Sequence, residues 1–180
     1  SANPLTDGFC REGLQRAARS LLRAYTDGSD RQAREEMSLA SLCGGLALAN
    51  ARLGAVHGIA GPFGGRFKAP HGAVCGRLLP FVAAANIKAL RERAPGASAL
   101  ERFLEAARIF TGDTGAAAED GAAWLQALCD RLQVPALSNY GFAGEHAPDL
   151  IAASMRSSSM KGNPVDLTAR ELENLLEQAQ

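Results

Sequence analysis

The sequence predicts an all-α protein, a bundle of about six to eight helices around a buried central helix. Apolar residues recur at three- and four-residue steps through most of the chain, as they do on the buried face of an amphipathic helix. Runs of alternating β-branched residues, which indicate strands, do not occur in the sequence. The length of 180 residues is typical of one domain, so we expect residues 1–180 to form a single helical domain.

The first helix is predicted to run from Pro4 to about Tyr25. Asn3 is a preferred N-cap residue, and Pro4 suits the first helical position because the N–H that it lacks would have no partner there. The apolar residues of this stretch share one face of the helix, and they are Phe9, Leu14, Ala18, Leu21, Leu22 and Tyr25.

A second helical segment is predicted after the turn "TDGSD" and extends to Gly61. Ser29 and Gln32 form a capping-box pattern at its start. After Met37 the segment is small and apolar on nearly all sides, which predicts a central helix that is buried on every face. His57 would then lie near the C-terminal end of this helix, beside the loop "GPFGGRFKAP".

The remaining helices follow from the same signals. A third helix is predicted from about His71 to Leu90, with a kink at Pro80. Thr168 and Glu171 form another capping-box pattern, which marks the start of the last helix. The helices between them are predicted at residues 98–110, 116–132 and 146–156.

The composition excludes several classes of function. Lys plus Arg and Asp plus Glu are equal, at 19 each, so no net charge attracts nucleic acid or an anionic membrane. We find no apolar run of about 18 residues and therefore expect no membrane span. The four cysteines lie far apart without C-x-x-C spacing, which favours reduced thiols and a cytoplasmic protein. No targeting segment is recognised at the start of the sequence.

His57 and His71 are candidate metal ligands. A short connection between two helices would bring both imidazoles to one crevice, and imidazole is a common ligand of Zn(II) and Fe(II). Cys75 follows His71 by four residues on the same helix face, so it is a candidate further ligand or lines the crevice. On spacing alone, half-buried structural histidines are the favoured interpretation. The third histidine, His146, is expected at the surface.

Three segments of the chain resemble the C-terminal helical domain of the iron-containing, or group III, alcohol dehydrogenases. That domain has a dehydroquinate synthase-like fold. The segments are "NPLTDGFCREGLQ", "ASLCGGLALANARLGAVHGIAGPFGGRFKAPHGAVCGRLLPFVAAAN" and "KGNPVDLTARELENLLEQA". The resemblance implies that His57 and His71 bind a divalent metal, Fe(II) or Zn(II), that faces the nicotinamide of NAD(P). It therefore favours ligands over structural histidines for this pair, and the metal would act as a Lewis acid during hydride transfer.

The chain also departs from the family pattern. The family's two other metal ligands, an Asp and a His, precede the segment that matches Asn3, and so does its dinucleotide-binding domain. We therefore expect that NAD(P) does not bind this chain alone. Many family members carry a histidine four residues after the one that matches His57, whereas this chain has Gly61, which opens room and removes a proton-relay group.

Three hypotheses remain open for the function of the chain. The first is the metal-binding part of such a dehydrogenase, which would need a nucleotide-binding half to oxidise a small-molecule substrate. The second is a stand-alone metal-dependent hydrolase that activates water to attack an activated ester or phosphoester. The third is a non-catalytic oligomerisation module. Apolar surface that would face the other half predicts a homodimer or larger assembly.

Overall fold

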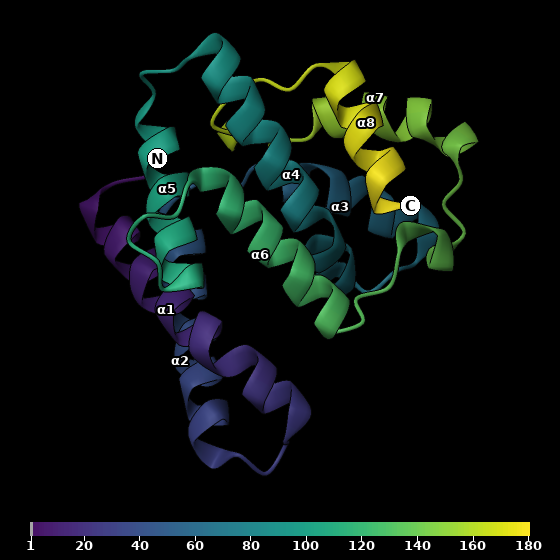
Figure 1. The fold of residues 1–180 in the computed structure, drawn as a ribbon. Helices are drawn as coiled ribbons and strands as arrows, with labels where there is room; N and C mark the ends of the chain where they lie inside the picture. The colour runs from purple at the N-terminus through teal and green to yellow at the C-terminus, as the bar shows by residue number, and fades with distance from the viewer. Residues whose placement is uncertain (1) are drawn as a thin grey trace. The chain divides into compact units, whose positions relative to one another are not determined.

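The computed structural model describes residues 2–180, and these residues form helices and connecting segments without a β-strand (Figure 1). The all-α fold class is therefore confirmed. The α-helices are α1 (Pro4–Thr26), α2 (Arg31–Asn50), α3 (Ala55–Phe67), α4 (His71–Arg93), α5 (Ser98–Thr111), α6 (Ala118–Arg131), α7 (Ala147–Arg156) and α8 (Ala169–Ala179). Short 3-10 turns are η1 (Leu137–Tyr140), η2 (Gly144–His146) and η3 (Met160–Gly162).

The helices form two compact units. The first unit comprises the residues up to Arg52 together with Arg102–Trp124, and the second comprises Leu53–Glu101 together with Leu125–Gln180. In the first unit α1 and α2 pack as an antiparallel pair, joined by the turn at residues 27–30. In the second unit α3, α4, α7 and α8 surround one hydrophobic core.

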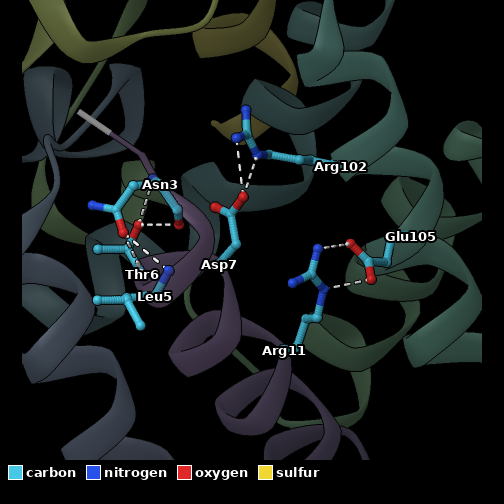
Figure 2. A network of polar contacts seen from close by, with 7 residues as sticks. All are labelled: Asn3, Leu5, Thr6, Asp7, Arg11, Arg102 and Glu105. Atoms are coloured by element: carbon cyan, nitrogen blue, oxygen red, sulfur yellow. Dashed lines mark hydrogen bonds and ion pairs between the residues drawn. The ribbon is translucent and has the colours of Figure 1, made fainter.

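The start of α1 is capped as the sequence predicts. The Asn3 side-chain oxygen accepts hydrogen bonds from the N–H groups of Leu5 and Thr6, at 3.0 and 3.1 Å (Figure 2). The Thr6 hydroxyl oxygen in turn accepts from the Asn3 N–H at 2.9 Å, so the cap is reciprocal. These bonds satisfy N–H groups that the helix itself leaves without partners.

Two ion pairs tie α1 to the part of α5 in the same unit. A guanidinium nitrogen of Arg102 lies 3.0 Å from the Asp7 carboxylate (Figure 2). Arg11 donates two parallel hydrogen bonds to the Glu105 carboxylate, at 2.6 and 3.0 Å. The side chains are partly exposed, so solvent screens both pairs and each adds little to stability. The two pairs therefore connect α1 to α5 at two positions of each helix.

The prediction that the segment after Met37 forms the buried central helix is wrong. In α2 only Ala33 and Ala47 are buried, whereas Leu42 is 58% exposed. The helix begins after Asp30, whose carboxylate accepts from the Ala33 N–H; Ser29 instead donates to Asp27. Small apolar residues show that a helix can pack closely, but they do not specify how many of its faces find a neighbour.

The predicted continuous helix up to Gly61 is also interrupted. Residues 51–54 separate α2 from α3, and Gly54 is the N-cap of α3. The segment expected as a loop is mostly helical, because α3 continues to Phe67 before a turn at Lys68 with φ of 50°. Pro62 lies inside this helix after Gly61, which has no Cβ to clash with the proline ring.

The central helix of the second unit is α4. Its buried residues are Val74, Leu78, Pro80, Val82, Ala83, Asn86, Ile87, Ala89 and Leu90. Around it lie fully buried side chains of the neighbouring helices, including Phe63 of α3, Leu150 of α7 and Leu176 of α8. Burial of such side chains is the main source of stability in this unit.

Among residues 2–180, α4 is long and apolar enough to cross a membrane, judged by length and composition alone. The helices α2 and α3 together also meet this criterion, as a span with a bend between them. The expectation that no segment has this character is therefore wrong. Half of the α4 window is buried inside the chain, as in the core helix of a soluble protein, which passes the same test.

Candidate metal centre

The α3–α4 hairpin brings the two predicted histidines together. His57 is the third residue of α3 and His71 is the first residue of α4, with only residues 68–70 between the helices. The centroids of the two imidazole rings lie 5.4 Å apart, with 51° between the ring planes. The expectation that His57 lies near the end of a helix is wrong, since it occupies the first turn of α3.

Cys75 joins the two histidines in one cluster of donor atoms. It lies one helical turn after His71, and its Sγ atom is 3.4 Å from His71 Nε2. One ligand atom each of His57, His71 and Cys75 lie within 4.8 Å of one another, and no other group of three His, Cys, Asp or Glu residues described here is arranged in this way. The cluster contains no carboxylate.

The geometry of the cluster fits a divalent metal of the zinc class. With bonds of about 2.0–2.1 Å to nitrogen and about 2.3 Å to sulfur, tetrahedral ligand atoms lie about 3.3–3.6 Å apart. The Cys75 to His71 distance of 3.4 Å falls in this range. Small side-chain rotations would bring the His57 nitrogen to a similar distance, because the helices already hold all three donors within 4.8 Å.

The protonation states suit a ligand role for His57. Burial lowers the pKa of the half-buried His57, and the neighbouring His71 lowers this pKa further. His57 is therefore neutral at neutral pH, with a ring nitrogen lone pair available to a metal. Burial raises the pKa of the Cys75 thiol, so binding of a metal as thiolate would release its proton.

His146 is separate from the cluster. Its Nδ1 accepts a hydrogen bond from the Ala143 N–H at 3.0 Å, and its ring packs edge-on against Phe67 at 5.2 Å. The side chain is 25% exposed, so the expected surface residue is partly buried and has a structural role.

Gly61 lies one turn after His57 on α3. A Cβ atom added at Gly61 would meet no neighbouring atom within 4 Å, apart from the chain neighbours and the helix's own backbone. The absence of a side chain therefore leaves open space on this side of the helix, as expected from the sequence.

Two residues beside the start of α3 were not identified from the sequence. Asn163 belongs to the polar segment "SMRSSSMKGNP", and Asn86 is the one polar residue among the buried residues of α4. Their side chains bond to each other, and Asn163 also bonds to the start of α3. The available signal was an Asn on the apolar face of a predicted core helix, which requires a buried polar partner.

Comparison with known proteins gives the family. A model of the C-terminal domain of the Fe-containing alcohol dehydrogenase family matches residues 1–180. The chain belongs to the iron-containing alcohol dehydrogenase family. It is 32% identical to alcohol dehydrogenase 4 of Saccharomyces cerevisiae over 183 residues, which cover 99% of this chain and 45% of the yeast protein. It is 45% identical to 1,3-propanediol dehydrogenase of Klebsiella pneumoniae over 92 residues, which cover 51% of this chain and 24% of that protein.

Solved structures of the family have the same fold. A 1,3-propanediol oxidoreductase superposes with a TM-score of 0.86 at 31% identity, and the alignment covers 99% of this chain and 46% of that one. An alcohol dehydrogenase from Oenococcus oeni gives a TM-score of 0.86 at 29% identity, with 99% and 46% covered. Almost all of this chain is matched in each of these full-length alignments, but it spans only about half the length of each relative. Membership in this family implies a divalent metal.

Proposed function

We propose that His57, His71 and Cys75 bind the divalent metal of an iron-containing alcohol dehydrogenase site, with Zn(II) or Fe(II) as the ion. The observation that carries the proposal is the convergence of three donor atoms within 4.8 Å on one helical hairpin. Two imidazoles and a thiolate are donors that zinc-class metals accept, and catalytic sites typically take about three ligands from the protein. Cys75 favours zinc over iron, because a thiolate is the softer ligand.

The residues of the hairpin have distinct roles in this proposal. When bound, the ion supplies Lewis-acid chemistry, since it polarises an alcohol or carbonyl oxygen and lowers the pKa of a hydroxyl group. His57 offers a neutral imidazole from a half-buried position. His71 is exposed, so a substrate can approach the cluster from its side. Gly61 leaves space for that substrate one turn along α3.

The reaction that we propose for the whole enzyme is hydride transfer between NAD(P) and a small alcohol or its carbonyl product. The relatives' names support it, since they include 1,3-propanediol dehydrogenase, choline dehydrogenase and a long-chain-alcohol dehydrogenase. These names also show that substrates vary within the family. Because this chain matches less than half of alcohol dehydrogenase 4 from yeast, we propose that it supplies the metal-binding half and that NAD(P) binds with the other half.

A second candidate is metal-dependent hydrolysis of an activated ester or phosphoester by residues 1–180 alone. The observation that favours it is that one hairpin holds three donors, which leaves a coordination position for water in a tetrahedral site. The test is hydrolysis of p-nitrophenyl acetate with added Zn(II). Activity that requires Zn(II) and is lost in His57→Ala would support this candidate, and activity unchanged by that substitution would reject it.

The experiment that tests the metal site is a Co(II) titration of the chain, followed by its visible absorption. We expect His57→Ala and His71→Ala to weaken binding at least tenfold while far-ultraviolet circular dichroism stays unchanged. His146→Asn is the matched control, because it removes a histidine outside the cluster and keeps an acceptor for the Ala143 N–H. Equal Co(II) affinity in all four proteins would show that the histidines are not ligands.

A further inference from the structure

Asn163 makes an unusually complete set of hydrogen bonds beside α3. Its Oδ1 accepts from the Ala55 N–H at 3.0 Å and from Asn86 Nδ2 at 3.2 Å. Its Nδ2 donates to Asn86 Oδ1 at 2.7 Å and to the Val165 carbonyl at 2.7 Å. The side chain thus uses both donors and accepts twice, and Asn86 is only 4% exposed. Such a saturated amide pair, with Asn86 buried and Asn163 partly buried, holds its neighbours in one geometry.

The bond to Ala55 caps α3 from a distant part of the chain. Ala55 is the first residue of α3, and its N–H has no partner within the helix. The N-cap residue, Gly54, has no side chain that could cap the first turn. Asn163 instead accepts from the Ala55 N–H, from 108 residues further along the chain. The position at which α3 begins is therefore set by a tertiary contact and not by a local cap.

The segment of Asn163 also lies directly against the helix on both sides of His57. A Cβ atom on Gly54 would lie 3.0 Å from Asn163 Oδ1, and a Cβ atom on Gly58 would lie 3.1 to 3.4 Å from atoms of Met160. These two glycines permit the close approach, because a larger residue would push the segment away. The first turn of α3, which carries His57, is therefore held against residues 160–163.

The same amide pair connects the two helices that carry the histidines. Ala55 lies two residues before His57 on α3, and Asn86 lies on α4, the helix that begins with His71. Asn163 bonds to both helices at once. We propose that Asn163, together with Asn86, is a positioning residue that fixes His57 relative to His71. The proposal rests on the proposed metal site, and Asn163 itself is not a ligand.

The test is the Co(II) affinity and the visible spectrum of Asn163→Ala. We expect a 10- to 100-fold weaker affinity, as is typical when a group that orients a metal ligand is removed, and an altered ligand-field spectrum. Thr168→Ala is the control for stability alone, since it removes the N-cap of α8 in the same unit and the hydrogen bonds described for the Thr168 side chain go to Glu171. We expect it to lower the melting temperature with unchanged affinity and spectrum.

A second substitution tests whether the effect acts through the start of α3. In Asn163→Ala the amide that blocks a Cβ on Gly54 is gone, so Gly54→Ser can be added to supply a local N-cap. The backbone at Gly54 is extended, with φ of −134°, which serine adopts without strain. A serine at the N-cap can accept a hydrogen bond in the first turn of α3, but it does not restore the connection to Asn86. We therefore expect the double variant to regain stability and to recover little of the lost Co(II) affinity. Asn86→Ser gives a milder loss in the same direction and serves if Asn163→Ala does not fold.

The outcomes separate this inference from the proposed function. If His57→Ala and His71→Ala weaken Co(II) binding but Asn163→Ala and Asn86→Ser do not, the metal site stands and the positioning role is wrong. The positioning role is also wrong if Thr168→Ala weakens binding as much at an equal loss of melting temperature. It is likewise wrong if Gly54→Ser fully restores the affinity of Asn163→Ala, because a local cap would then suffice without the connection between α3 and α4. If the histidine variants leave Co(II) binding unchanged, both proposals fall.

Discussion

Replacement of Cys75 by serine tests whether the thiol is a ligand or only lines the metal site. The structure places its Sγ 3.4 Å from His71 Nε2. With metal bonds of about 2.3 Å to sulfur and about 2.05 Å to nitrogen, this distance corresponds to a ligand–metal–ligand angle of about 100°, near the tetrahedral value. The thiol therefore needs little movement to bind an ion that His71 also binds.

The size of the effect follows from the energy of comparable sites. Structural zinc sites with four ligands bind with about 10–16 kcal/mol, or roughly 2.5–4 kcal/mol for each ligand. Because this site is partly exposed and a serine hydroxyl retains weak ligand character, we expect Cys75→Ser to cost about 2–3 kcal/mol. Since about 1.4 kcal/mol corresponds to a tenfold change, the Kd for Zn(II) should rise about 30- to 150-fold.

The assay is competition between Zn(II) and Co(II), followed by the near-ultraviolet band that a thiolate gives when it binds Co(II). The band should be present in the unchanged chain and absent in Cys75→Ser. Cys129→Ser is the matched control, since this buried thiol donates to the Gly76 carbonyl at 3.2 Å and a serine hydroxyl keeps that bond. An unchanged Kd, or a Co(II) complex of the unchanged chain that lacks the band, would refute the ligand role of Cys75.

Three further predictions concern stability and assembly. Leu78→Ala, at a fully buried position of α4, should lower the free energy of unfolding by about 2–5 kcal/mol in urea titrations, whereas Leu79→Ala next to it, at a position 41% exposed, should cost under about 1 kcal/mol. Burial alone would raise the pKa of Glu171, but its hydrogen bond with Arg93 contributes to a net lowering. The stabilising contribution is therefore present above the pKa that this carboxyl has in the unfolded chain and is lost as the pH falls through the lower folded pKa. Glu171→Gln should therefore reduce the acid-dependent change in melting temperature. The exposed leucines of α2 should form the contact surface of a homodimer. Light scattering should therefore show a dimer, and Leu42→Glu should dissociate it. A monomer in the unchanged chain would reject this expectation.

The local signals in the sequence predicted the helices well and their surroundings poorly. The caps at Asn3 and Thr168 are confirmed, because a cap depends on residues three or four positions apart. The break at residues 51–54 was not predicted, because Gly54 has no side chain to signal a cap. The start of α3 is instead hydrogen-bonded to Asn163, which is distant in the sequence. The choice of α4 as the central helix was missed for the same reason, because burial depends on neighbours that are distant in sequence.

The candidate site shows the same division. The sequence by itself predicted the helical class from periodicity, and its resemblance to a known family predicted the family and the candidate pair His57 and His71. Only the tertiary structure decided that Cys75 shares a cluster with both histidines and that Asn163 holds α3 beside α4. Ala55 and Asn163 are 108 residues apart, and a hydrogen bond over that separation has no periodic signal; it exists only once the helices have packed.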